Sequence, residues 1–190
     1  MLFHPSTVHT RIDTPLGAMV LSASEAGLNG AWFDGQRHQP TSDAWPQATR
    51  HPVLLAAQEQ LLAYFAGARE HFALPLDLSG GTAFQRAVWQ ALLAIAPGAT
   101  CSYGALAHQL ARPAAVRAVG AAVGRNPISV IVPCHRVLGH AGALTGYAGG
   151  LPRKSALLQR ESALLELAAW APPGRPKVPG TAARSAEVLQ

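Results

Sequence analysis

Residues 102–124 read SYGALAHQLARPAAVRAVGAAVG, and this stretch decides the fold of the second half of the chain. Ser102 is suited to cap a short helix. Arg112 and Pro113 then form a turn, and Pro113 suits the first position of a second helix, which stops at Gly124. Two short helices joined by a tight turn predict a helix-turn-helix, although many helical hairpins share this pattern.

The second of these helices has an unusual surface. Small residues surround one long side chain, Arg117: they are Ala114, Ala115, Ala118, Gly120, Ala121 and Ala122. A helix of small residues lets its backbone approach another surface closely, at a cost of about 1 kcal/mol for a glycine inside a helix. Two interpretations stay open here, which are close packing between helices and entry into a narrow groove with Arg117 as the probe.

Upstream, the sequence alternates between apolar runs and turn residues. The pattern predicts strands over 8–13, 18–22, 28–33 and 72–76, and a helix over about 52–66. The predicted inner face of that helix carries Val53, Ala57, Leu61 and Phe65. The first three strands form a small antiparallel meander.

The composition changes at Leu78-Ser-Gly-Gly81, where we expect a domain boundary near residue 80. Thr82 and Gln85 fit a capping box that opens a helix ending at Pro97-Gly98. A buried strand is expected over 128–132 and a last helix from Pro152 to about Leu167. The prediction is an α+β chain with a supporting domain (1–80), a mostly helical domain (81–167) and a mobile tail (168–190).

Composition limits the class of protein. Of 190 residues, 49% are apolar and 13% are charged, a balance typical of a folded domain and opposite to that of a disordered chain. No apolar run is long enough for a membrane span, and the N-terminus has no basic segment followed by an apolar one. We therefore expect a cytoplasmic protein that does not interact with membranes.

Charge is unevenly distributed. Residues 1–80 hold four arginines against seven carboxylates, a net charge of −3, whereas residues 81–190 hold eleven basic side chains against three acidic ones, a net charge of +8. No carboxylate side chain lies between Asp77 and Glu161. Such a stretch suits a polyanion such as nucleic acid, although an idle basic surface would look the same.

Cys134 and His135 are the candidate chemical centre, directly after Pro133 and the predicted strand. A neighbouring histidine raises the thiolate fraction of a cysteine, and Glu161 could orient that histidine as a third member. The alternative is a structural cysteine beside a surface histidine. Cys101 is interpreted as a small apolar residue, and two cysteines with scattered histidines predict no metal site.

The sequence from Ile131 to Val137, IVPCHRV, resembles the active-site motif of the O6-alkylguanine-DNA alkyltransferases. The resemblance covers about residues 82–162 in order. It continues through Ser102-Tyr103, Arg117 to Gly120, Asn126-Pro127, Gly146 to Gly150 and Leu157-Leu158 to Glu161. It implies a ribonuclease-H-like first domain, a winged helix-turn-helix-like second domain, a monomer and no cofactor.

The resemblance also implies roles for individual residues. Cys134 would accept an alkyl group once and irreversibly, from O6-alkylguanine and also from O4-alkylthymine in double-stranded DNA. His135 would act as base through a water, oriented by Glu161, while Asn126 would brace the turn and Tyr103 would assist the leaving guanine. Arg117 would replace the flipped nucleotide, and Tyr103 and Arg112 would contact phosphates. Val137, Tyr147 and Ala148 would line the base pocket.

Some features depart from the family. Ala148 stands where some members have serine, so altered substrate tolerance is expected. No cysteine precedes residue 101, so the zinc site of some members should be missing. Two other functions are alternatives: a DNA-binding protein that flags alkyl lesions without transfer, and a Cys-His hydrolase that would turn over repeatedly.

Overall fold

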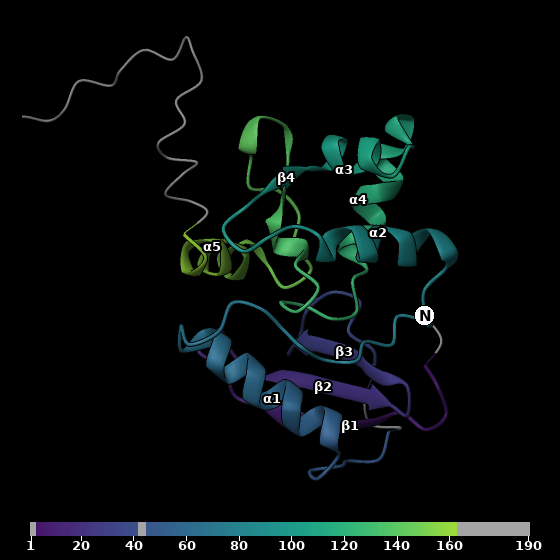
Figure 1. Ribbon diagram of the computed structural model, residues 1–190, viewed down its shortest axis with the longest axis vertical. Coiled ribbons are helices and arrows are strands. Elements are labelled where there is room, and N and C mark those ends of the chain that lie inside the picture. The colour runs from purple at the N-terminus through teal and green to yellow at the C-terminus, as the bar shows by residue number, and fades with distance from the viewer. Residues whose placement is uncertain (1–2, 42–44, 163–190) are drawn as a thin grey trace, which may run out of the picture.

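The computed structural model describes residues 3–41 and 45–162 of an α+β chain. The first half is a three-stranded antiparallel sheet of β1 (Val8–Ile12), β2 (Met19–Ser24) and β3 (Gly27–Phe33), in the order β1-β2-β3. The helix α1 (Pro52–Phe65) packs against all three strands. In Figure 1 this sheet and α1 occupy the lower part of the molecule, and the helices of the second half lie above them.

Two of the three strands, β2 and β3, are buried on both faces. Every residue of β2 and β3 is buried, because α1 covers the sheet on one side while a turn from the second half lies along β3. Ala31 of β3 donates its N–H to the Pro127 carbonyl at 2.9 Å, and its carbonyl accepts the N–H of Ser129 at 2.8 Å. Strand β3 therefore helps to position the segment that leads into Cys134.

The three strands of the meander are confirmed, but two details of the first half were predicted wrongly. The segment 72–76 is not a strand; it makes one isolated bridge, between Leu76 and Leu28. The inner face of α1 consists of Leu54, Ala57, Leu61 and Tyr64. The predicted face was rotated toward Val53 and Phe65, and it missed the buried Tyr64.

The second half is mostly helical. Its elements are α2 (Ala83–Leu93), β4 (Cys101–Ser102), α3 (Tyr103–Gln109), α4 (Val116–Gly124), β5 (Val137–Leu138) and α5 (Leu151–Arg160), with three 3-10 turns: η1 (Pro113–Ala115), η2 (Cys134–Arg136) and η3 (His140–Gly142). Strands β4 and β5 pair in parallel. The predicted capping box is present, because Thr82 Oγ1 accepts the Gln85 N–H and Gln85 Oε1 accepts the Thr82 N–H.

Several helix boundaries differ from the prediction. Helix α2 ends at Leu93, four residues before Pro97. Pro113 starts a 3-10 turn, and α4 begins at Val116. Helix α5 ends at Arg160, with Glu161 as its C-cap. The predicted tail 168–190 lies outside the described residues.

The two halves share one hydrophobic core. Buried residues of the sheet, of α1 and of the second half belong to a single cluster. Trp89 of α2 is fully buried and donates its indole N–H to the Ala122 carbonyl at 2.9 Å. Among the described residues, no helix combines the length and apolar character needed to cross a membrane.

Candidate active site

The segment expected as a strand over 128–132 is a compact turn. Val130 has a φ of +73°, and Val132 donates its N–H to the Ile128 carbonyl at 2.9 Å. The side chain of Asn126 stabilises this turn: Nδ2 donates to the Val132 carbonyl at 2.8 Å, and Oδ1 accepts the Ile128 N–H at 3.0 Å. The β-branched run suggested a strand, but the buried Asn126 amide takes over the backbone hydrogen bonds that a strand partner would make.

Cys134 opens the 3-10 turn η2 and is 5% exposed. Asn126 Nδ2 lies 3.1 Å from its Sγ. Burial raises the pKa of the Cys134 thiol above its usual value, while the Asn126 hydrogen bond and the charge of Lys154 act in the opposite direction. The thiol is thus protonated at rest, next to groups that favour its anion.

His135 and Glu161 form a buried pair. His135 Nε2 lies 3.0 Å from Glu161 Oε1, and neither side chain is exposed to solvent. Burial lowers the pKa of His135, and Glu161 opposes the shift in part. A neutral His135 that donates from Nε2 leaves Nδ1 as the basic nitrogen, and Nδ1 has no hydrogen-bond partner among the described residues.

Glu161 is surrounded by donors that sequence reasoning missed. Arg136 donates from Nε to Oε2 and from Nη2 to Oε1, each at 2.8 Å. Tyr64, on α1, donates its hydroxyl to Oε1 at 2.7 Å. Burial alone would raise the pKa of Glu161, but hydrogen bonds from Arg136 and His135 lower it well below its usual range. The carboxylate is therefore charged at neutral pH.

Lys154 is the third residue missing from the prediction. It is fully buried, and its Nζ donates to the carbonyls of Val137 and Thr145, each at 2.6 Å. Burial lowers its pKa from 10.5 to about 8. A lysine in an apolar helix pattern is ordinarily assigned to solvent, so its interior position was not apparent from the sequence.

The predicted pocket residues lie in β5 and in the Gly-rich loop that follows it, residues 139–150. Val137 and Tyr147 are buried and Ala148 is half-buried. The Tyr103 hydroxyl lies 3.4 Å from the Gly146 carbonyl, so α3 touches this loop. Burial raises the pKa of Tyr103, with a further contribution from Cys134.

The predicted DNA-facing residues lie on α4 and the turn before it. Arg117 and Arg112 are exposed, and Arg112 lies over the Phe84 ring at 5.7 Å. On α4, Ala118 and Ala121 are also exposed. A Cβ at Gly120 would lie 3.8 Å from the Tyr103 ring. This is an ordinary van der Waals distance, so packing against α3 does not require a glycine here, and the exposed alanines beside Arg117 leave an open face.

Only part of the long basic stretch is exposed. Arg136 and Lys154 are buried, and Arg153 and Arg160 are half-buried with hydrogen bonds to backbone carbonyls. The exposed members are Arg86, Arg112, Arg117 and Arg125. Four of the eight basic side chains between Asp77 and Glu161 are thus buried or half-buried, so the net charge overstated the basic surface.

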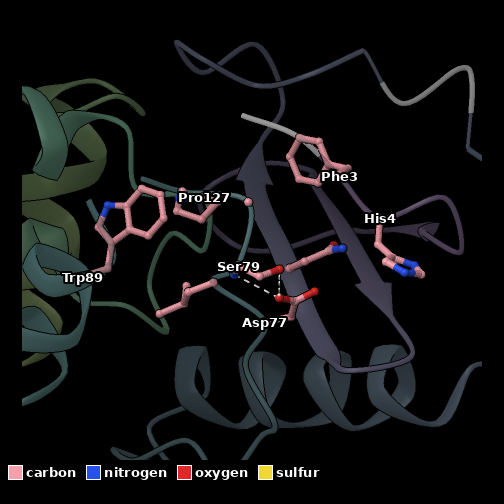
Figure 2. A pocket seen from close by; sticks show the side chains of 10 residues that line it. Phe3, His4, Asp77, Ser79, Trp89 and Pro127 are labelled. Carbon is pink, nitrogen blue, oxygen red and sulfur yellow. Dashed lines mark hydrogen bonds between the residues drawn. The ribbon is translucent and has the colours of Figure 1, made fainter. Parts of the chain in front are cut away.

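Other candidate features lie apart from this centre. A cavity of about 10 Å³ lies where the two halves meet. Trp89, Pro127 and Asp77 are among its lining residues (Figure 2). Its volume suits about one water, and Asp77 there accepts hydrogen bonds from Ser79. Cys101 is half-buried in β4. In the described part of the chain, no cluster of His, Cys, Asp or Glu could hold a metal ion.

The geometry defines an α+β protein with a candidate nucleophilic cysteine. The buried cysteine lies beside a His–Glu pair, and a pair of helices with an exposed arginine lies next to it. Residues 83–163 match the family described as 6-O-methylguanine DNA methyltransferase, DNA binding domain. Residues 7–78 match its ribonuclease-like domain. These ranges adjoin near residue 80.

Individual relatives agree with the family matches. The methylated-DNA–protein-cysteine methyltransferase of Mycolicibacterium paratuberculosis is 46% identical over 134 residues, which cover 70% of this chain and 79% of the relative. The constitutive enzyme of Bacillus subtilis is 41% identical over 140 residues, which cover 72% and 84%. The chain belongs to the methylated-DNA–protein-cysteine methyltransferase family.

Solved structures show the same fold. The crystal structure of the Mycobacterium tuberculosis O6-methylguanine methyltransferase has a TM-score of 0.75 and 44% identity, covering 83% of this chain and 93% of that one. A structure of the Mycobacterium tuberculosis protein in complex with DNA has the same TM-score and identity, covering 82% and 92%.

Proposed function

We propose that the chain repairs DNA by direct reversal, transferring an alkyl group from O6 of guanine to its own Cys134. The observation that carries this proposal is the buried Cys134 thiol, held by Asn126 next to the His135–Glu161 pair. A protein that only flagged lesions would need no such thiol. The family membership and a DNA-bound relative support the same reaction.

The transfer is a single displacement. His135 takes the thiol proton through one water, and Cys134 Sγ attacks the alkyl carbon as the bond from that carbon to O6 breaks. The guanine leaves with the electron pair of the broken bond and takes up a proton at its ring. The product is a thioether, which no group of the site can displace, so each chain acts once and needs no cofactor.

The charges of the site suit this sequence of steps. His135 is neutral at rest and can accept a proton, and the Glu161 carboxylate stabilises the imidazolium that forms. Lys154, near Cys134, favours the thiolate. Burial keeps the thiol protonated at rest, so His135 must take up its proton before Sγ can attack.

The leaving guanine is a poor anion, so an acid beside it accelerates its departure. Tyr103 is the candidate acid, because its hydroxyl lies at the rim of the Gly-rich loop. Its raised pKa keeps the phenol protonated, as a proton donor must be.

An alkylated guanine must leave the duplex before Cys134 can reach it. We assign this step to α4, whose small exposed residues suit the minor groove while Arg117 fills the vacated place. Arg112 and Tyr103 contact the flanking phosphates. The flipped base then lies among Val137, Tyr147 and Ala148. The missing hydroxyl at Ala148 alters the range of alkyl groups accepted, and O4-alkylthymine is a second substrate.

We further propose that the chain acts as a monomer in the cytoplasm, with a domain boundary near residue 80. The test of the reaction is Cys134→Ala, assayed with duplex DNA that carries a labelled O6-methylguanine. The variant should bind this DNA as the natural chain does and transfer no label. Residual transfer to the variant would overturn Cys134 as the acceptor.

A further inference from the structure

The Glu161 carboxylate receives hydrogen bonds from both halves of the chain. From the second half, His135 lies at 3.0 Å and Arg136 donates twice. From the first half, the Tyr64 hydroxyl donates to Oε1 at 2.7 Å, the shortest of these contacts. A residue of the ribonuclease-like half therefore touches the carboxylate that orients His135.

Tyr64 can act only as a donor in this contact. The residue is fully buried, and burial together with the Glu161 carboxylate raises the pKa of its phenol above the usual value. The phenol keeps its proton throughout the pH range in which a protein works, and a charged acceptor makes such a hydrogen bond stronger than a neutral one.

The ring of Tyr64 is fixed on its other sides. The Arg160 guanidinium lies over the ring at 4.0 Å, and the Phe65 and Phe72 rings lie 5.4 Å away. Arg160 also donates to the Tyr64 carbonyl and, at 2.9 Å, to the Arg69 carbonyl. The ends of α1 and α5 are thus joined next to Glu161, so the hydroxyl has little freedom to leave the carboxylate.

We propose that Tyr64 is a positioning residue for alkyl transfer, through which the first half of the chain holds the Glu161 carboxylate in the orientation that His135 needs. This inference rests on the proposed function. It gives the ribonuclease-like half a part in the chemistry, beyond packing against the second half. Tyr64 makes no hydrogen bond to the Cys134 thiol; it acts through Glu161.

The Tyr64 hydroxyl and His135 both contact Oε1 of Glu161. This shared oxygen determines the direction in which loss of the hydroxyl should shift the His135 pKa. Without the hydroxyl, more of the negative charge on Oε1 faces His135, and the imidazolium form becomes more stable. The charged groups around the pair are otherwise unchanged: Glu161 faces Arg136, and His135 faces Arg136 and Lys154. Loss of the hydroxyl should therefore raise the pKa of His135.

Tyr64→Phe tests this inference, because it removes the hydroxyl and keeps the ring. The matched control is Gln60→Met, one helical turn earlier on α1. Gln60 hydrogen-bonds the N–H and the carbonyl of Ala73 and makes no hydrogen bond to Glu161 or His135, so its loss should reduce stability alone. The readouts are the His135 pKa, followed by NMR of labelled imidazole, and the pH profile of transfer from free O6-benzylguanine.

For Tyr64→Phe, we expect the His135 pKa and the acid limb of the profile to move up by about 0.5 to 1 unit, with transfer slowed about 3- to 10-fold at the acid end. Gln60→Met should keep the natural profile. A profile and His135 pKa equal to those of the natural chain would overturn the inference, as would a loss that is equal at every pH. Absence of transfer by the natural chain would instead overturn the proposed function.

A second variant covers the case in which Tyr64→Phe does not fold. Site-specific replacement of Tyr64 by 3-fluorotyrosine keeps the ring and makes the phenol a stronger donor. The inference then predicts a shift of the opposite sign, with a lower His135 pKa. An unchanged or raised His135 pKa would contradict it.

Discussion

The side-chain nitrogen of Asn126 lies 3.1 Å from the sulfur of Cys134, and the same nitrogen donates to the Val132 carbonyl at 2.8 Å. One buried amide therefore holds both the turn that precedes the cysteine and the thiol itself. Any change at Asn126 should affect stability and transfer together.

Asn126→Ala should lower the free energy of unfolding by about 2 to 3 kcal/mol, because the backbone groups it serves stay buried without partners. Transfer should also slow, since the turn no longer fixes the thiol. Asn29→Ala is the control: Asn29 is a buried amide that bonds Ser22 and Thr7 within the first half. Urea unfolding and transfer rates separate the two effects. An equal loss of transfer in both variants would show that stability alone is responsible.

Glu161→Gln should lower the free energy of unfolding by about 3 kcal/mol at neutral pH, because Arg136 would be left buried without its carboxylate. The pKa of Glu161 is depressed in the folded state, so its contribution exists above the usual value of 4.5 and is lost as the pH falls. The difference between the natural chain and the variant should thus shrink below about pH 4.5. Unfolding measured from pH 3 to pH 8 checks this, and a difference independent of pH would contradict it.

The sequence allowed the acceptor region to be predicted because its signals are local. IVPCHRV brings Cys134 and His135 together along the chain, and the capping residues Thr82 and Ser102 act within one helical turn. Glu161 was also predicted as the partner of His135, although they are 26 residues apart. The three strands of the meander were predicted for the same local reason.

The contacts that were missed depend on tertiary packing. Tyr64 and Glu161 are 97 residues apart in the sequence. Tyr64 is one of several residues on the buried face of α1, and nothing in the sequence marks its hydroxyl as a hydrogen-bond donor to Glu161. Lys154 is buried because carbonyls of the Gly-rich loop surround its ammonium, and no pattern along α5 indicates this. The prediction of a strand over 128–132 was wrong because the Asn126 side chain supplies the hydrogen bonds of a turn.

Arg117→Ala should slow repair of O6-methylguanine in duplex DNA by roughly 100-fold, because unstacking a base costs a few kcal/mol that the arginine offsets. Reaction with free O6-benzylguanine should change little, since no base has to be flipped. Arg50→Ala, an exposed arginine of the first half, serves as the charge-matched control. The measurement is the single-turnover rate of transfer from duplex O6-methylguanine DNA and from free O6-benzylguanine. Equal decreases in the two rates would exclude a role in base flipping.

Gly149→Ala should disturb the base pocket. A Cβ at this position would lie 2.8 Å from Tyr147 Cε1 and 3.3 Å from Phe33 Cδ2, so the Tyr147 ring must move. We expect a loss of about 1 to 3 kcal/mol in stability and a greater loss of transfer for benzyl than for methyl groups. Gly124→Ala, where no neighbouring atom lies within 4 Å, should instead be neutral or stabilising. Melting curves measure the change in stability. Competition between O6-benzylguanine and O6-methylguanine measures the change in transfer.

Intact-protein mass spectrometry after incubation with excess O6-methylguanine DNA tests the central claim most directly. We expect a gain of about 14 Da, one methyl in place of one hydrogen, mapped to Cys134 and stopping at one per chain. An unchanged mass with DNA still bound, or methyl release with repeated turnover, would contradict it.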